Sequence, residues 1–184
     1  MMRIALLTWY QNENYGSSLQ AYALQNYLMK YGDCKIVDYR TKPVAVKISM
    51  FWEKKTRKRY WGKLVDKAIL FLRTDVKRRL DDNNRLYLDF IKDNLLFSNM
   101  FSEETLPMSN DDFDVFVCGS DQIWNPTRLD PAFLLGFTED DKTRIAYAPS
   151  IGVSSLNGFA EKKTIEKNII RFQHISVREK DAQN

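Results

Sequence analysis

The feature that most constrains the fold is an alternation of short apolar runs with helical patterns at the start of the chain. Residues 3–8, RIALLT, form a continuous apolar run, which is typical of a strand buried on both faces of a parallel sheet. A polar turn over 11–18 follows, and apolar residues then recur at helical spacing until Gly32. Residues 35–38 supply a second short strand, so this region predicts a βαβ unit. The apolar residues of the predicted helix are Ala21, Leu24, Leu28 and Tyr31.

The second half of the chain returns to the same alternation. Strands are predicted over 113–118, 144–148 and 174–177, and a helix over about 156–172. Repeated strand and helix periods are typical of parallel sheets that are covered by helices. We therefore predict an α/β fold built on a Rossmann-like, doubly wound parallel sheet. The length of 184 residues fits a single domain.

Residues 44–106 interrupt this alternation. Apolar residues at helical spacing over 64–72 and 86–91 predict a helical insertion here. The overlapping stretch 42–79 holds 13 Lys or Arg against 3 Asp or Glu, although the whole chain carries only +4. The basic excess is therefore local. It is either a solvated helical face or a patch that faces phosphates of a lipid-linked substrate, a membrane surface or nucleic acid.

Composition excludes several kinds of protein and site. No apolar run approaches the roughly 20 residues that span a bilayer, and the first strand lacks the features of a signal peptide, so we expect a cytosolic protein. Cys34 and Cys118 have no short-spaced partner and are expected to be reduced and structural. His174 is the single histidine, which excludes a two-histidine metal centre, and we predict no metal site. Because His174 opens its strand, we expect it away from the functional site.

A polar loop follows the first predicted strand, at the edge of the sheet where parallel α/β proteins bind ligands. Gly16 permits a tight turn or a close approach of backbone to a ligand, and Ser17 is placed to cap the helix. The loop is therefore either a well-made helix N-cap or part of a binding site. It matches neither the dinucleotide-binding motif nor the P-loop. The candidate binding residues of this loop are Asn14, Tyr15, Gly16 and Ser17.

A denser polar run, GSDQIWNP, follows the predicted strand over 113–118. Asp121 is a candidate proton carrier, and Trp124 is a candidate platform for a sugar ring. The alternative is structural, with Asp121 capping the next turn and Trp124 filling the core. The candidate binding residues in this run are Gly119, Ser120, Gln122, Trp124 and Asn125.

Two later predicted strands also end in polar residues. Ser150 follows the strand over 144–148, and Arg178 follows the last strand. The guanidinium group of Arg178 matches the geometry of a carboxylate or a phosphate. The alternative is a surface ion pair between Arg178 and an acid such as Glu179.

Four motifs occur in order along nearly the whole chain. They are NYGSSLQAYALQ at 14–25, GSDQIWNP at 119–126, IAYAPSIG at 145–152 and ISVRE at 175–179. Together they resemble the motifs of the polysaccharide pyruvyl transferase family. Four ordered motifs make a specific resemblance, which favours a functional role for the loops that follow the strands.

The resemblance implies a fold similar to that of GT-B glycosyltransferases, with an active site in the cleft between two Rossmann-like lobes. Family members are generally about twice as long as this chain. The resemblance therefore implies that residues 1–184 are the N-terminal lobe, that the C-terminal lobe is absent, and that the chain alone is inactive. A lobe that is made to face another exposes apolar surface, so self-association is also expected.

The resemblance further implies transfer of pyruvate from phosphoenolpyruvate to two hydroxyls of a saccharide or lipid-linked saccharide of a cell-surface polysaccharide. The products are a cyclic ketal and phosphate, and no metal or organic cofactor is required. Asp121 then serves as the acid/base or hydroxyl-orienting group, and Arg178 clamps an anion. Asn14, Gly16 and Ser17 then offer hydrogen-bond donors at a helix N-terminus. Gln122 and Asn125 contact sugar hydroxyls, and Trp124 forms a wall for the acceptor.

Two other functions stay open at this point. A GT-B-like lobe could instead transfer a sugar from a nucleotide-sugar. Alternatively, the chain is a non-catalytic module in which the stretch 42–79 binds anionic lipid or polymer. Binding to anionic lipid would place the protein at the inner membrane face. No nucleic-acid partner is expected, because the stretch matches no nucleic-acid-binding motif. Salt-sensitive binding that is lost on charge reversal would favour the module, and the residues to reverse are Lys54, Lys55, Arg57, Lys58 and Arg59.

Overall fold

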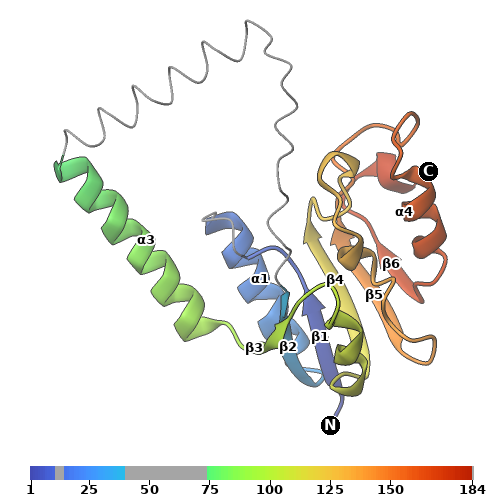
Figure 1. Cartoon of the computed structure of the whole chain (residues 1–184), viewed down its shortest axis with the longest axis horizontal. Helices are drawn as coiled ribbons and strands as arrows, with labels where there is room; N and C mark the ends of the chain where they lie inside the picture. Colours follow the sequence, from blue (N-terminus) through green and yellow to red (C-terminus); the bar gives the residue numbers. More distant parts are fainter. Residues whose placement is uncertain (11–14, 40–73, 184) are drawn as a thin grey trace, which may run out of the picture. The chain divides into compact units, whose positions relative to one another are not determined.

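The computed structural model describes residues 1–10, 15–39 and 74–183 (Figure 1). Within them, six strands form one sheet in the order β3-β2-β1-β4-β5-β6, and all neighbours are parallel. The chain runs outward from β1 to β3, then restarts at β4 beside β1 and runs outward on the other side, which places a topological switch point between β1 and β4. The predicted Rossmann-like sheet is confirmed. The strands are β1 (Arg3–Leu7), β2 (Asp33–Tyr39), β3 (Phe97–Phe101), β4 (Val115–Asp121), β5 (Thr143–Pro149) and β6 (His174–Ser176).

The two strands at the switch point are deeply buried. Residues 4–7 of β1 are at most 2% exposed, and residues 115–118 of β4 are also buried. Successive side chains point to opposite faces of a strand, so these continuous apolar runs show that both faces of the central sheet are covered. Cys34 and Cys118 lie in β2 and β4 as buried free thiols, and burial raises the pKa of Cys34 to about 12. Their predicted structural role is confirmed.

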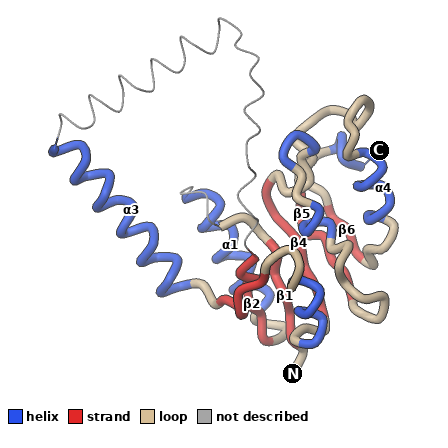
Figure 2. The backbone as a smooth tube through the Cα atoms, viewed as in Figure 1, coloured by secondary structure: helices blue, strands red, loops and turns tan. Residues whose placement is uncertain are grey.

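Helical segments join the strands, as Figure 2 shows. Helix α1 (Tyr15–Leu28) buries Ser17, Ser18, Ala21, Leu24 and Gln25, so its inward face begins with two hydroxyls. The sequence predicts Tyr31 in the apolar stripe, but it lies beyond the helix and is exposed. Among the described residues, the other α-helices are α3 (Thr74–Asn94) and α4 (Lys162–Ile169), and the short 3-10 helices are η1 (Leu106–Asp111), η2 (Pro126–Arg128), η3 (Pro131–Leu134) and η4 (Lys180–Gln183).

Gln25 explains how α1 is fixed on the sheet. Its side chain is 1% exposed, and its Nε2 donates to the backbone oxygens of Cys34 at 3.2 Å and Leu96 at 2.7 Å. Its Oε1 accepts from the Leu96 N–H at 3.1 Å. A buried amide of this kind is stable only when its polar atoms are paired. One side chain therefore connects α1 to β2 and to the segment that enters β3.

The helical insertion is shorter at its C-terminal end than the sequence predicts. Strand β3 lies inside the 44–106 segment and pairs with β2. The chain divides into two compact units, residues 1–42 with 92–184, and residues 43–91. Most of the basic stretch 42–79, including Lys54 and Arg57, lies outside the described residues. The predicted helix over 156–172 is also shorter, since α4 spans Lys162–Ile169. In the described part of the chain, no helix is both long and apolar enough to cross a bilayer.

The edge of the sheet where the strands begin is closed by charged side chains. Arg3 opens β1, and its Nη2 lies 2.6 Å from Oδ1 of Asp114, the residue that precedes β4. Its Nη1 also donates to the backbone oxygen of Asp111 at 2.9 Å. The Arg3 hydrogen bonds hold the pKa of Asp114 at about 2, below its usual value of 3.8.

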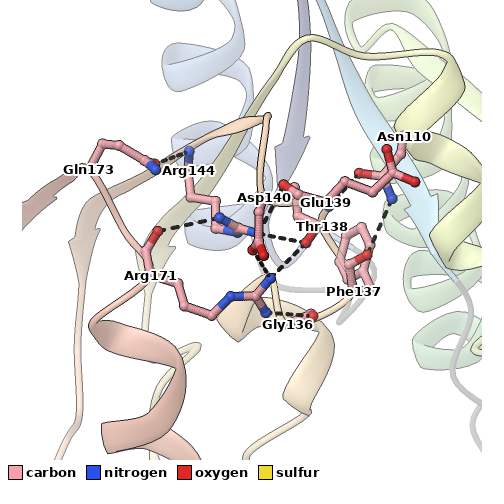
Figure 3. Close-up of polar contacts among 9 residues, drawn as sticks. All are labelled: Asn110, Gly136, Phe137, Thr138, Glu139, Asp140, Arg144, Arg171 and Gln173. Atoms are coloured by element: carbon pink, nitrogen blue, oxygen red, sulfur yellow. Dashed lines mark hydrogen bonds and ion pairs between the residues drawn. The ribbon is translucent and has the colours of Figure 1, made fainter.

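Arg144, at the start of β5, makes more hydrogen bonds at this edge than Arg3 does (Figure 3). Its side chain is 2% exposed, and its Nη2 donates to the backbone oxygens of Thr138 at 2.6 Å and Glu139 at 3.0 Å and to Asp140 Oδ1 at 3.2 Å. Arg171 donates to the same Thr138 oxygen and the same Asp140 oxygen, each at 2.9 Å. Two guanidinium groups thus hold the loop that connects η3 to β5.

Candidate active site

The carboxyl ends of β1 and β4 meet at the switch point, and Gln20 of α1 joins them. Its Nε2 donates to Thr8 Oγ1 at 2.7 Å and to the Trp9 backbone oxygen at 3.2 Å. Its Oε1 accepts from the Ser120 hydroxyl at 2.8 Å and from the Ser120 N–H at 3.3 Å. Open parallel sheets bind ligands at this point because the connections that leave the two neighbouring strands run in opposite directions and leave a crevice. Gln20 was not predicted as a site residue, although it lies in the 14–25 motif.

Asp121 ends β4 beside the first turn of α1. One carboxylate oxygen, Oδ2, accepts from the Ser17 hydroxyl at 2.9 Å, and the other, Oδ1, accepts from the Gln122 N–H at 2.8 Å. The side chain is partly exposed, and its backbone adopts a positive φ of 78°. A carboxylate near a helix N-terminus is favoured by the helix dipole. The sequence placed Ser17 and Asp121 in separate loops, and the structure brings them into contact.

Gly119 and Ser120 belong to the strand, which corrects the prediction that they lie in a loop after it. Strand β4 begins at Val115 and continues to Asp121. Gly119 has a φ of 130°, and a Cβ there would overlap the backbone oxygen of Tyr147 in the neighbouring strand β5. Glycine is therefore required for close pairing of the two strands at this position. Gly119 is buried, whereas Ser120 is partly exposed and hydrogen-bonded to Gln20.

Gln122 and Asn125 form a polar corner after β4. Gln122 Oε1 accepts from Asn125 Nδ2 at 3.3 Å and from Arg128 Nη2 at 3.0 Å. Asn125 Oδ1 caps η2 by accepting from the Thr127 N–H at 3.0 Å. Gly152, beyond β5, lies against this corner, since a Cβ there would approach Asn125 Nδ2 to 2.6 Å. The loops after two neighbouring strands therefore pack on each other at this edge.

Trp124 does not line the site, so its predicted role as a wall for the acceptor is wrong. The side chain is 1% exposed and packs in the main core. Its Nε1 donates to the Phe133 backbone oxygen at 3.0 Å, and its ring meets Phe172 edge-on. A buried indole needs a partner for its N–H, and Phe133 supplies it. The structural alternative considered for Trp124 is therefore the observed one.

Polar residues also follow β5 and β6 at the carboxyl edge of the sheet. Ser150 is fully buried, its N–H donates to the Asp121 backbone oxygen at 2.9 Å, and its hydroxyl donates to Glu179 Oε1. Arg178 Nε lies 3.5 Å from the same Glu179 oxygen, with half of the Arg178 side chain exposed. Oε2 of Glu179 is buried and accepts no hydrogen bond from any described residue. Glu179 thus links Ser150 to Arg178, a role that the sequence did not assign.

Gly119 and Trp124 are buried, as described above, and the other predicted site residues fall into three groups. Ser17, Ser120, Asp121, Gln122, Asn125, Ser150 and Arg178 come together along the carboxyl edge of the sheet, from α1 to β6. Tyr15 and Gly16 lie in the exposed first turn of α1. Asn14 lies outside the described residues. His174 opens β6, away from this edge, as predicted. Within the described ranges, no group of three or more His, Cys, Asp or Glu is arranged to hold a metal ion.

These observations define an α/β protein with a Rossmann-like parallel sheet and a polar site at its switch point. The family model for polysaccharide pyruvyl transferase matches residues 14–184, so the chain belongs to that family. The match includes all four motifs that carried the resemblance. No curated protein and no solved structure matches the chain.

Proposed function

We propose that this chain serves the transfer of pyruvate from phosphoenolpyruvate to two hydroxyls of a saccharide in a cell-surface polysaccharide. The enol methylene carbon of the donor gains a proton and becomes a methyl group, the bond from C2 to the phosphate oxygen breaks, and phosphate leaves. The two sugar oxygens each form a bond to C2 and release their protons. Membership of the family supports this reaction class, and the arrangement around Asp121 supports the placement of the chemistry.

Asp121 is the group proposed to move a proton. Among the described residues, each carboxylate oxygen accepts from one donor, Ser17 Oγ or the Gln122 N–H, so the position of the group is fixed and these contacts leave lone pairs for a ligand. It lies at the switch point and is partly exposed, which a group that meets a substrate requires. Proton transfer by a positioned carboxylate typically contributes about 10²- to 10⁴-fold to a rate.

Arg178 is proposed to bind an anionic group of the donor. Half of its side chain is exposed, and its ion pair with Glu179 is made through Nε at the long distance of 3.5 Å. The two terminal nitrogens are the ones that form a fork to a carboxylate or phosphate. Ser150 takes a different role from the one predicted. Its hydroxyl donates to Glu179, so it positions the residue beside Arg178 and does not face the substrate.

Gln122 and Asn125 are proposed to contact hydroxyls of the saccharide acceptor, since they follow Asp121 in the loop after β4 and their side-chain amides are hydrogen-bonded to each other. Their mutual hydrogen bond fixes both amides before a ligand arrives, which lowers the entropic cost of binding. The scheme requires no organic cofactor.

Calorimetric titration with phosphoenolpyruvate tests the proposal directly. We expect saturable binding by the parent chain, and at least tenfold weaker binding by Arg178→Met, because the fork to the donor is lost. Lys163→Met, on the exposed surface of α4, removes one positive charge elsewhere and should leave the affinity unchanged. Equal affinities for the parent and Arg178→Met, or no binding by the parent, would contradict the proposed donor.

A further inference from the structure

A second arginine, Arg128, lies at this edge and was not among the predicted site residues. It ends η2, and its guanidinium carbon lies 5.4 Å from the centroid of the Trp9 ring, in a cation–π contact. Trp9 follows β1 at the switch point and is held in turn by an edge-on contact with Phe133, at 6.3 Å between ring centroids. The aromatic platform under Arg128 is therefore attached to the core.

A hydrogen bond fixes the guanidinium group from another direction. Arg128 Nη2 donates to Gln122 Oε1 at 3.0 Å, and Asn125 Nδ2 donates to the same oxygen. Asn125 also caps η2, the short helix that carries Arg128. The planar group thus lies in one orientation before any ligand binds, although the side chain is exposed.

The partners of Arg128 are neutral, which distinguishes it from the arginines at the opposite edge. Arg3, Arg144 and Arg171 each form an ion pair with an aspartate. Arg128 forms no ion pair with any residue that the structure describes. Asp130, two positions further along, uses its Oδ1 for the Ala132 N–H and the Tyr39 hydroxyl instead. Most of the five N–H donors of Arg128 and its whole charge therefore remain available.

We infer that Arg128 is an anion-binding residue that takes a phosphate group at the carboxyl edge of the sheet. Its planar fork matches phosphate oxygens, and the loop that carries it follows Asp121 directly. If the proposed function holds, on which this further step rests, the donor carries two anionic groups, and Arg128 and Arg178 each bind one of them.

Inorganic phosphate is the probe that tests Arg128 without assuming the reaction. We expect calorimetry to show phosphate binding by the full chain, and about tenfold weaker binding by Arg128→Met. Arg128→Lys should recover part of the affinity, since it keeps the charge but loses the fork and the planar stack on Trp9. Arg85→Met is the matched control, because Arg85 is an exposed arginine of α3. Circular dichroism confirms that each variant is folded.

The two proposals fail in different ways. Equal phosphate affinity in the parent and Arg128→Met, or no phosphate binding by the parent, overturns the assignment of Arg128. Phosphate binding that depends on Arg128, without any binding of phosphoenolpyruvate, supports Arg128 as an anion-binding residue and contradicts the proposed donor. Weaker binding of both anions by Arg128→Met supports both proposals.

Discussion

Arginines lie at both edges of the sheet but have different roles at each edge. Where the strands begin, Arg144 and Arg171 share Asp140 and several backbone oxygens, and Arg3 pairs with Asp114. Where the strands end, Arg128 and Arg178 are exposed and have few partners. The number of partners, and not the residue type, separates a guanidinium group that stabilises the fold from one that is available to a ligand. Sequence composition alone could not locate the site for this reason.

Asp121→Asn tests the carboxyl edge and should give the largest effect. In an assay in which the chain is supplied with the second lobe that the family resemblance implies, we expect the rate of pyruvyl transfer to fall by about a thousandfold, because the amide cannot carry the proton. The free energy of unfolding should change by less than about 1 kcal/mol, since surface and partly exposed substitutions of similar shape are mild. Phosphate release and urea denaturation measure the two quantities. Asp89→Asn, on the exposed surface of α3, is the control. A variant as active as the parent would remove Asp121 from the mechanism.

Arg144→Met tests the amino edge. It should lower the free energy of unfolding by about 2–3 kcal/mol, because it removes the donor to the backbone oxygens of Glu139 and Arg171. Arg171→Met should cost less, since the Arg171 side chain is 30% exposed. Urea denaturation measures both, and the folded fraction of each variant should bind phosphoenolpyruvate like the parent. Weaker donor binding by Arg144→Met at unchanged stability would contradict the claim that arginines at the amino edge stabilise the fold and do not bind the ligand.

Gln20→Met tests the junction of β1 and β4. The substitution keeps the size of the side chain but removes the partner of Thr8 Oγ1 and of the Ser120 hydroxyl and N–H. We expect a loss of about 1–3 kcal/mol in the free energy of unfolding. Asn26→Met, on the exposed face of the same helix, should cost less than half as much. Equal losses for the two variants would show that the Gln20 contacts do not hold the strand ends together.

The loss of stability at low pH that comes from Asp114 should be the smallest effect. Asp114 has a pKa of about 2 in the folded protein because of Arg3, against an ordinary value of 3.8. A depressed carboxyl pKa contributes stability that is present above the ordinary value and is lost as the pH falls through about 2. Asp114→Asn should therefore be less stable than the parent at pH 5, and the difference should shrink towards pH 2. Urea midpoints at several pH values measure it, and a difference that does not change with pH would contradict this account.

Much of the fold was predictable because the central strands bury both faces. A continuous apolar run as short as residues 4–7, bounded by polar residues, is typical of a fully buried strand, and such runs predicted β1 and β4, which the structure places in the middle of the sheet. Strand β3, FSNMF, carries no such run, since four of its five residues are partly or fully exposed. Its neighbours have helical spacing, so the sequence placed it in a helical insertion.

The site was predictable only as a set of strand endings. Polar residues after predicted strands indicated Asp121 and Arg178, because the carboxyl ends of parallel strands share one edge. Nothing local marks Gln20 as the partner of Ser120, which is 100 positions away along the chain. Trp124 likewise follows a strand in a polar run, and only its packing shows that it belongs to the core. Contacts between residues that are far apart along the chain separate site residues from core residues, and these contacts cannot be read from a single sequence.

The backbone of Asp121 limits how its mutants can be interpreted. Its φ of 78° is a conformation that glycine, asparagine and aspartate adopt readily and that alanine or glutamate adopts with strain. An alanine scan of this edge would therefore score Asp121 as essential even if its carboxylate took no part in the reaction. Position 121 consequently has a short list of informative replacements, in which asparagine reports on chemistry and glycine reports on the loss of the side chain. Selection for folding stability alone among random variants should enrich these same few residues at position 121.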